Sequence, residues 1–587
     1  MDWEALKQEV RQGLRVRIDS REVEPGDLFI VLEENKRFVK DACINGARYF
    51  VVGPEHKDLI PQIEDVQIVS VLDPKRSLGD LAAAYYGTEK QNFILIGITG
   101  TNGKTTTSYF LEHLLTHVGL KVGVIGTVNY RWLDYVEDSV LTTPGCMKLH
   151  EIIAKMRSQG VDAIIMEVSS HGLAQDRVAG LKFDFAVFTN LTQDHLDYHR
   201  DMEDYFSAKA KLFYKYLRHK GTAIINLDDP YGQKLVNVLD KKIIGYTISS
   251  KNMEKSISAH ILSSFRGMQK VRFSYETREW EIQTPFIGTH NVYNLLAAQG
   301  VGLAMGLKHE VFKCFEENFK IPGRMEKVEN SKGLNVYIDY AHTPDALARA
   351  LMAMKDMNFK RTIVVFGCGG NRDRDKRSKM GEAASKYSDV IVVTSDNPRF
   401  EDPKKIIEDI LPGINSSKPL VVEVDRKRAI QKAIEIMEKD DALLIAGKGH
   451  ETYQEIKGVR YPFRDKKSGF GDIGFMELRL YELGSILGSI GNYMEFQDTV
   501  LGSIKTDSRL VEPGDLFVCL QGNRFDGHSF AKEAVARGAK AIVSMKMLRE
   551  LEKKSTNNYS QGYPGRLAAY SQTLKGKVSG KGNRYYR

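Results

Sequence analysis

The sequence IGITGTNGKTTT, residues 96–107, joins an apolar run to a helical pattern. The run Phe93–Ile98 is typical of a buried strand, and the apolar spacing over residues 109–115 predicts a helix. Backbone N–H groups in a glycine turn attract phosphate, as does the N-terminus of a helix. A purely structural turn is the alternative, but the Gly-Lys-Thr triplet at this junction favours a nucleotide-binding loop.

The polar residues of this loop have distinct expected roles. Lys104 is expected to reach the terminal phosphates, and Thr105 to offer its hydroxyl to Mg²⁺. The glycine spacing is shorter than in the general G-x-x-x-x-G-K-[ST] loop, because Gly100 lies three residues before Gly103. The candidate ATP-binding residues of the loop are Gly100, Thr101, Asn102, Gly103, Lys104, Thr105 and Thr106.

Length and composition exclude several classes of protein. A chain of 587 residues is expected to hold about three or four domains. The net charge of +8 is modest and does not indicate nucleic-acid binding. Five cysteines without CxxC spacing predict free thiols in a reducing compartment. Since no long apolar run is present, we expect a cytoplasmic protein without a membrane-spanning helix.

Two distant segments of the chain repeat each other. DSREVEPGDLFIVL begins at Asp19, and DSRLVEPGDLFVCL begins at Asp507. A degraded echo of residues 78–86 follows at 565–578, and the second copy then ends without a second GKT. We therefore expect two related lobes but a single phosphate-binding loop.

Between the repeats, strand and helix patterns alternate, which predicts parallel α/β layers. Predicted strands include Ala163–Val168 and Val390–Thr394, and predicted helices include Tyr205–Leu217, Pro344–Asp356 and Arg428–Lys439. In open α/β sheets the carboxyl ends of the strands collect ligands, so polar residues that follow these strands are candidates for a site.

Glu167 and His195 each follow a predicted strand. A carboxylate and an imidazole at neighbouring strand ends suit Mg²⁺ beside a nucleotide, although Mg²⁺ usually prefers oxygen ligands. In the alternative interpretation, Asp194 caps a helix that carries His195 and His199 on its face. The spacing alone leaves both interpretations open.

Ten motifs over about residues 15–465 resemble, in order, those of the Mur ligases, the ATP-dependent amide-forming enzymes of peptidoglycan precursor synthesis. The motifs are TGTNGKTTT, EVSSHGL, NLTQDHLDYH, YFSAKAKLF, GTHNVYNLLAA, PGRME, DYAHTPD, GCGGNRDRDKR, TSDNPR and GKGHETYQ. The resemblance implies an α/β fold of three domains with an extra C-terminal α/β lobe. The expected divisions are a UDP-sugar-binding lobe (1–92), a central ATPase (93–320), a Rossmann-like amino-acid-binding domain (321–470), a second partial lobe (474–555) and a disordered tail (556–587).

The resemblance assigns catalytic and nucleotide-binding roles. It implies that Lys104, Glu167, His195 and Lys209 are catalytic, and that Thr105, Glu167, His195 and a carbamate on Lys209 are ligands of Mg²⁺. A solvated helix lysine is the alternative for Lys209. Matching positions around adenine and ribose are His290, Asn291, Asn294, Arg324 and Asp339, although asparagines in turns or helix caps look the same in a sequence.

The resemblance also assigns two substrate sites. For the UDP-N-acetylmuramoyl dipeptide it implies Ser20, Thr142, Thr143, Ser169, Gln175 and Arg177; loop hydroxyls are the alternative for Ser169 and the adjacent Ser170. For meso-diaminopimelate it implies Arg372, Asp396, Asn397, Arg399, Gly447 and Glu451. Diaminopimelate has a distal carboxylate that lysine lacks, so a pocket arginine would be left unpaired by lysine. A DNP turn beside a surface arginine is the alternative.

Two departures from the family pattern are visible. The first lobe has EENKRFVKDA where the second keeps RFDGHSF, so the uridine pocket of the first lobe is expected to be trimmed. The glycine-turn motif reads NRDRDKR where close relatives more often have DRDKGKR, which keeps Arg372 but changes the loop that follows it.

We therefore expect an ATP-dependent ligase that acts on small molecules and binds neither nucleic acid nor membrane, with other enzymes of the pathway as candidate partners. The alternatives are a lysine-adding homologue, a folylpolyglutamate synthase-like ligase, and a non-catalytic UDP-sugar-binding protein. From Met476 onward the chain resembles the N-terminal lobe of the D-alanyl-D-alanine-adding Mur ligase. Because this part lacks a GKT, we expect it to be a truncated fusion that does not catalyse that reaction.

Overall fold

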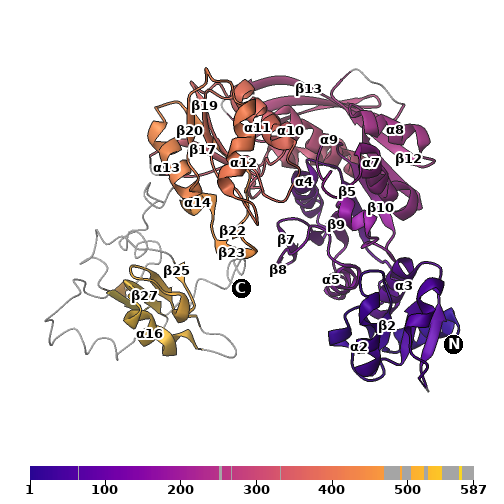
Figure 1. Cartoon of the computed structure of the whole chain (residues 1–587). Helices are drawn as coiled ribbons and strands as arrows, with labels where there is room; N and C mark the ends of the chain where they lie inside the picture. Colours follow the sequence, from indigo (N-terminus) through magenta and orange to yellow (C-terminus); the bar gives the residue numbers. More distant parts are fainter. Residues whose placement is uncertain are drawn as a thin grey trace. The chain divides into compact units, whose positions relative to one another are not determined.

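The structure is a computed structural model (Figure 1) that describes residues 1–63, 65–249, 254–265, 267–330, 332–468, 490–491, 504–520, 526–544 and 568–571. It divides into two compact units, residues 1–328 with 334–469, and residues 329–333 with 470–587. No helix among the described residues is long and apolar enough to cross a membrane.

The N-terminal lobe is a parallel four-stranded sheet in the order β1-β2-β3-β4. The inner strands β2 and β3 are continuous apolar runs because helices cover both faces: α1 and α3 bury one core and α2 the other. The elements are α1 (Trp3–Arg11), β1 (Val16–Arg17), β2 (Leu28–Ile30), α2 (Val39–Ile44), β3 (Tyr49–Val52), β4 (Gln67–Ser70) and α3 (Pro74–Tyr86).

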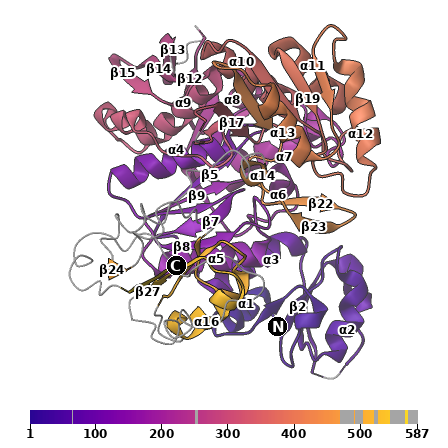
Figure 2. The same cartoon turned by 90° about the vertical axis from the view of Figure 1, so that its left-hand side faces the viewer.

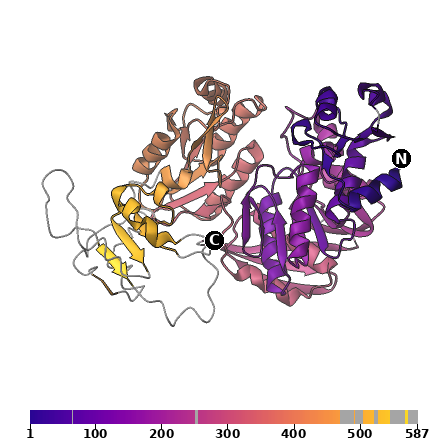
Figure 3. The same ribbon diagram turned by 90° about the horizontal axis from the view of Figure 1, so that it is seen from below.

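The central domain is built on an eleven-stranded sheet in which β5 lies between β10 and β9. Helices α4 and α9 pack on one face of this sheet and α5 and α7 on the other; all four are labelled in Figure 2, and Figure 3 shows this purple region of the chain from below. The strands are β5 (Ile94–Thr99), β6 (Val122–Ile125), β7 (Asn129–Trp132), β8 (Tyr135–Asp138), β9 (Ala163–Glu167), β10 (Phe183–Phe188), β11 (Leu217–Asn226), β12 (Lys242–Thr247), β13 (Ser256–Phe265), β14 (Met268–Tyr275) and β15 (Arg278–Thr284). The helices are α4 (Lys104–His117), α5 (Cys146–Ser158), α6 (Ser170–Ala174), α7 (Met202–Lys211), α8 (Pro230–Val238) and α9 (Thr289–Ala304).

The next domain holds a six-stranded sheet in the order β16-β17-β21-β18-β19-β20, followed by a hairpin of β22 and β23. The strands are β16 (Glu326–Lys327), β17 (Asn335–Asp339), β18 (Thr362–Phe366), β19 (Val390–Val393), β20 (Leu420–Val422), β21 (Ala442–Ala446), β22 (Tyr453–Ile456) and β23 (Val459–Pro462). The helices are α10 (Pro344–Asp356), α11 (Lys376–Tyr387), α12 (Pro403–Ile410), α13 (Arg426–Ile436) and α14 (Asp465–Ser468).

The second unit repeats the sheet of the first lobe. Its strands β25 (Ile504–Lys505), β26 (Leu516–Val518), β27 (Ala541–Ser544) and β28 (Ala568–Ser571) pair in parallel in that order, and β24 (Ile490–Gly491) is added antiparallel to β28. Leu28 pairs with Val16 in the first copy, as Leu516 pairs with Ile504 in the second. Helix α16 (Ala531–Ala536) takes the place of α2. Most of the predicted disordered tail lies outside the described residues, but its described part is strand β28.

Most predicted elements are present, with bounds that differ by a few residues; the two largest differences have a structural reason. The helix predicted over 205–217 is wrong at its end, because α7 stops at Lys211, a π-helical turn follows, and Leu217 already begins β11. Helix α13 begins at Arg426, two residues before its predicted start, because the Asp425 side chain caps it by accepting from the Arg428 N–H.

A buried ion pair ties α13 to α14. Arg426 Nε and Nη2 donate to the two carboxylate oxygens of Asp465 at 2.7 and 2.8 Å, and both side chains are fully buried. Because a bidentate pair satisfies both charges away from water, removal of one partner leaves the other charge uncompensated.

We expect Asp465→Ala to lower the free energy of unfolding by about 3–5 kcal/mol, the cost of leaving a buried charge unpaired. Urea unfolding followed by circular dichroism measures the change. Lys432→Met is the matched control. It breaks the more exposed ion pair between Lys432, on α13, and Glu423, and we expect it to cost under about 1 kcal/mol. Equal losses in the two variants would contradict this account.

Candidate functional site

The glycine loop connects β5 to α4 at the middle of the central sheet. Gly100 has a φ of +147°, and a Cβ there would lie 1.8 Å from Thr189 Oγ1, so the position has no room for a side chain. The Thr101 N–H donates to the Asn190 carbonyl, and the Asn102 N–H to Asn190 Oδ1, both at 2.9 Å. The segment after β10 therefore holds the loop in a defined shape.

Lys104 folds back over this loop. Its Nζ donates to the carbonyl oxygens of Gly100 and Thr101, both at 2.9 Å. Burial lowers the pKa of Lys104, and the charge of Glu167 partly offsets that effect. The lysine is thus held where phosphates would meet the loop's N–H groups.

Glu167 ends β9 beside the loop and is almost completely buried. Its carboxylate accepts from Thr105 Oγ1 at 2.9 Å, from the Thr127 N–H at 3.0 Å and from Thr127 Oγ1 at 2.9 Å. A hydroxyl and a carboxylate form an oxygen donor set that fits Mg²⁺, which binds proteins through few side chains and keeps phosphate and water ligands. In the described part of the chain, no three His, Cys, Asp or Glu side chains cluster as a metal site.

Asp194 and His195 lie in an irregular segment after β10, so the interpretation of residues 194–199 as a capped helix is wrong. The Asp194 carboxylate lies 3.5 Å from His195 Nε2, 3.7 Å from His342 Nε2 and 3.8 Å from Lys376 Nζ. Burial alone would raise the pKa of Asp194, but these neighbours hold it well below its usual range. Burial lowers the pKa of His195 to about 3, so its imidazole is neutral. In the part of the chain that the structure describes, neither a hydrogen bond nor an ion pair joins His195 to Glu167.

Lys209, on α7, is 1% exposed, so the interpretation as a solvated lysine is wrong. Its Nζ donates to the Gly100 carbonyl at 2.8 Å and lies 4.5 Å from the centre of the Tyr205 ring. Burial, followed by the charge of Lys104, holds the pKa of Lys209 well below its usual value. A neutral amine is the form that reacts with an electrophile such as CO₂, so the environment suits the predicted carbamate.

The predicted adenine and ribose residues divide into two groups. Asn294 and Asn291 are buried within α9, which rules out turn or cap roles, and Asn294 accepts from Thr107 Oγ1 at 3.3 Å. Arg324 Nη2 donates to Thr105 Oγ1 at 3.2 Å. Asp339 is occupied by backbone N–H groups at 2.7 and 2.8 Å. Among the described residues, no hydrogen bond joins Asp339 or His290 to the glycine loop.

Four of the predicted substrate residues form one network beside Glu167. Thr143 Oγ1 donates to the Glu167 carbonyl at 3.0 Å and accepts from the Ser169 N–H at 2.9 Å. Arg177 donates to Gln175 Oε1 at 2.7 and 3.0 Å and to the Thr143 carbonyl at 2.9 Å. Ser169 Oγ caps α6, so its hydroxyl has a structural role as well as a place in this network.

Thr142 joins this network, whereas Ser20 lies apart from it. Thr142 Oγ1 lies 3.1 Å from Thr127 Oγ1, which donates a hydrogen bond to the Glu167 carboxylate. Ser20 is buried in the N-terminal lobe, where its carbonyl accepts from Asn45 Nδ2 at 2.8 Å. The contacts given for the described residues do not connect Ser20 with the other five.

The residues predicted to bind the amino acid lie at the carboxyl ends of β18, β19 and β21, three strands that lie side by side. Asp396 and Asn397 are 8% and 3% exposed, so the surface-turn interpretation is wrong. Asn397 Nδ2 donates to Glu451 Oε2 at 2.9 Å, and the Asn397 N–H to Asp396 Oδ1 at 2.7 Å. At Gly447, which has a φ of +113°, a Cβ would lie 2.5 Å from Asp396 Oδ2.

The two predicted arginines approach each other at Gly369, where a Cβ would lie 3.0 Å from Arg399 Nη1 and 3.8 Å from Arg372 Cγ. Arg399 has a φ of +51° and donates to the Gly370 carbonyl at 2.9 Å. Arg372 is half-exposed and lies 3.3 Å from Asp197 of the central domain. The Arg399 guanidinium therefore lies against the glycine turn, whereas that of Arg372 faces the central domain.

Comparison with known proteins identifies the family. Models described as Mur ligase middle domain and as Mur ligase, glutamate ligase domain match residues 98–302 and 323–449, and one described as Mur ligase family, catalytic domain matches 501–564. A relative from Lawsonia intracellularis, named UDP-N-acetylmuramoyl-L-alanyl-D-glutamate–2,6-diaminopimelate ligase, is 45% identical over 79% of this chain and 96% of its own length. The chain belongs to the Mur ligase family.

Solved structures of Mur ligases share the three-domain fold. A structure with the same name as that relative is 32% identical, covers 78% of this chain and 94% of its own, and has a TM-score of 0.57. The MurF ligase from Thermotoga maritima, solved in complex with ADP, is 18% identical, covers 75% of this chain and 95% of its own, and has a TM-score of 0.52, a likeness in fold alone.

Several residues of this Mur ligase site were missed in the sequence. His342 and Lys376 approach Asp194 from the C-terminal domain, and Lys448 and Arg426 lie beneath the amino-acid pocket. His342, Lys376 and Lys448 stand inside quoted motifs, so motif membership was an available signal. Arg426 lies in none of the motifs, and its place depends on packing between α13 and α14.

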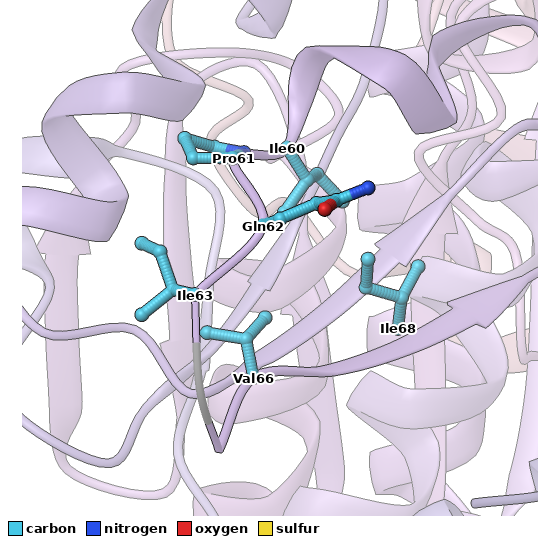
Figure 4. Close-up of a pocket in the computed structure, with 6 residues that line it drawn as sticks. All are labelled: Ile60, Pro61, Gln62, Ile63, Val66 and Ile68. Atoms are coloured by element: carbon cyan, nitrogen blue, oxygen red, sulfur yellow. The ribbon is translucent and has the colours of Figure 1, made fainter.

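A separate hollow lies in the N-terminal lobe of this Mur ligase (Figure 4). It has a volume of about 400 Å³ and is lined mainly by apolar side chains. The lining residues are Ile60, Pro61, Gln62, Ile63, Val66 and Ile68. None of the predicted site residues is among them, so the hollow is not assigned to the reaction.

We expect Gly100→Ala to weaken ADP binding about tenfold or more, because the added methyl collides with Thr189 and the φ of +147° is strained for alanine. Isothermal titration calorimetry measures the affinity. Gly119→Ala is the control: Gly119 also has a positive φ, but a Cβ there meets nothing within 4 Å. If both variants bind ADP equally well, the close approach at Gly100 does not shape the nucleotide loop.

Proposed function

We propose that this chain is an ATP-dependent ligase that joins meso-2,6-diaminopimelate to UDP-N-acetylmuramoyl-L-alanyl-D-glutamate, with ADP and phosphate as products. The observation that carries the proposal is the 45% identity, over nearly the whole relative, to a protein named for this pair of substrates. The two carboxylates and two arginines around the pocket support the choice of amino acid, because diaminopimelate presents both charges at its distal end.

In the first step, an oxygen of the terminal D-glutamate carboxylate attacks the γ-phosphorus of ATP, and ADP leaves with the electrons of the broken P–O bond. Lys104 neutralises charge on the phosphates, and Asn294 and Arg324 position the nucleotide. Thr105 and Glu167 would hold Mg²⁺, with His195 and a carbamate on Lys209 as further candidate ligands; when bound, the ion neutralises the charge that develops on the phosphate oxygens.

In the second step, the diaminopimelate amine attacks the carbonyl carbon of the acyl phosphate. The C–N bond forms, phosphate leaves, and the nitrogen loses a proton to give the amide. Asp396 and Glu451 bind the distal ammonium, and Arg372 and Arg399 bind the distal carboxylate through paired N–H donors. Orientation of the amine accounts for much of the rate.

The remaining parts of the chain are proposed to bind substrate or to be accessory. We assign residues 1–92, including Ser20, to the uridine end of the substrate, and Thr142, Thr143, Ser169, Gln175 and Arg177 to its sugar, diphosphate and peptide. Residues 93–320 activate the carboxylate, and residues 321–470 supply the amine. The second lobe, residues 474–555, is a binding module without its own GKT. The reaction belongs to the cytoplasm, where ATP is available.

The direct test is phosphate release by the purified chain supplied with UDP-dipeptide, ATP, Mg²⁺ and meso-diaminopimelate. We expect phosphate release only when all four are present. We also expect kcat/KM to be lower by about a hundredfold or more with L-lysine, since lysine has no distal carboxylate for Arg372 and Arg399 to bind. Absence of release with the complete mixture would refute the proposed function. Equal use of both amino acids would refute the selectivity alone.

The pocket predicts a specific effect of one methyl group. Gly447→Ala places a Cβ 2.5 Å from Asp396 Oδ2, so we expect the KM for diaminopimelate to rise about tenfold and the KM for ATP to stay unchanged. Initial-rate kinetics measure both constants. Gly13→Ala serves as the control, because Gly13 has the same φ of +113° and a Cβ there meets nothing within 4 Å. An unchanged KM for diaminopimelate in Gly447→Ala would show that Asp396 does not bind this substrate.

A further inference from the structure

A buried lysine lies beneath the amino-acid pocket. Lys448 follows β21, and its side chain is 0% exposed. Its Nζ donates to Glu451 Oε2 at 2.8 Å and to Asn397 Oδ1 at 3.1 Å. A buried lysine is costly unless it is paired and hydrogen-bonded, and both of its partners here are pocket residues.

The amide of Asn397 closes this arrangement. Its Oδ1 accepts from Lys448 Nζ and from the Glu455 N–H at 2.9 Å, so its Nδ2 faces Glu451, to which it donates at 2.9 Å. Lys448, Asn397 and Glu451 therefore form a triangle of hydrogen bonds. The donor and acceptor ends of the amide are set by Lys448, because an ammonium group has no acceptor.

This triangle determines which carboxylate oxygens remain free for a ligand. Glu451 Oε2 is occupied by two donors, whereas Oε1 accepts no hydrogen bond from the residues that the structure describes. Asp396 is similar: Oδ1 accepts from the Asn397 N–H, and Oδ2 lies 4.0 Å from Arg426 Nη1, beyond hydrogen-bond distance. Each acid thus keeps one oxygen anchored and presents the other.

The balance of buried charge points the same way. Arg426 is committed to Asp465 through two hydrogen bonds, and Arg399 and Arg372 lie beside other carboxylates, those of Glu455 and Asp197. Lys448 is then the cation that compensates one of the two pocket carboxylates, and one negative charge is left. Burial would raise the pKa of Asp396, but the charges of Lys448 and Arg426 hold it below its usual value. A pocket with one uncompensated carboxylate suits a ligand that brings one ammonium.

We propose that Lys448 is the positioning residue of the amino-acid pocket: by holding Glu451 Oε2 and the Asn397 amide, it aims the free oxygen of Glu451 at the ammonium of the incoming amino acid. The inference rests on the proposed function for the identity of that amino acid. Lys448 itself does not touch the substrate. Lys448 is therefore a determinant of specificity that acts through Glu451.

The first measurement is the kinetics of Lys448→Met, which keeps the length of the side chain but removes its charge and donors. We expect the KM for diaminopimelate to rise about tenfold or more, with the KM values for ATP and UDP-dipeptide within about twofold of wild type. A general loss of structure would instead affect all three constants. Lys432→Met, which removes an exposed lysine of the same domain, is expected to change none of them.

The second measurement is a double-mutant cycle with Glu451→Gln. If Lys448 acts through Glu451, the double variant has a KM for diaminopimelate within about threefold of Glu451→Gln alone, because the two effects are not independent. Effects that multiply would overturn the inference. If Lys448→Met does not fold, Lys448→Arg keeps the charge but displaces the hydrogen bonds, and we expect the same selective rise in KM at about threefold or more.

Different measurements refute the proposed function and the role of Lys448. A wild-type chain that releases no phosphate with any diamino acid refutes the proposed function and, with it, this inference. An active wild type whose Lys448 variants keep the KM for diaminopimelate refutes the role of Lys448 alone.

Discussion

Two lysine side chains converge on one carbonyl oxygen, that of Gly100. Lys104 Nζ reaches it from the start of α4 at 2.9 Å, and Lys209 Nζ reaches it from α7 at 2.8 Å. Burial lowers the pKa of both lysines, and the charge of Lys104 lowers the pKa of Lys209 further. The arrangement is stable because Gly100 has no side chain and because Glu167 and Asp194 supply negative charge nearby.

The rest of the site is arranged around this loop by the order of the strands. Because β10, β5 and β9 are neighbours, the loop, Glu167 and the Asp194 segment meet at one edge of the sheet. The C-terminal domain contributes from its own strand ends in the same way. Contacts such as Arg324 with Thr105 and Asn102 with Asp345 join the two edges, so that a carboxylate activated on one domain can meet an amine held by the other.

Residue chemistry was readable where a short motif carries its own reason. GKT after a strand predicts phosphate binding, and DNPR predicts a pocket for a second carboxylate. The alternative interpretations that failed were those that depend on solvent exposure. In the sequence, Lys209 cannot be distinguished from an exposed helix lysine, or Asn397 from a turn asparagine, because the sequence does not show that both side chains are buried. Periodicity could not show that α7 ends at Lys211, because the apolar pattern continues through the π-helical turn into β11.

The sequence by itself determined the fold class, the repeat of the DSR lobe, the single nucleotide loop and most of the side chains proposed here for the sites. These depend on local pattern and on motifs, which survive without knowledge of packing. Only the tertiary structure decided which oxygen of Glu451 is free, that Lys448 supports it, and that Asp194 is shared between two domains. Those facts depend on contacts between residues far apart in the chain, and hydrogen-bond direction and burial are properties of the packed molecule.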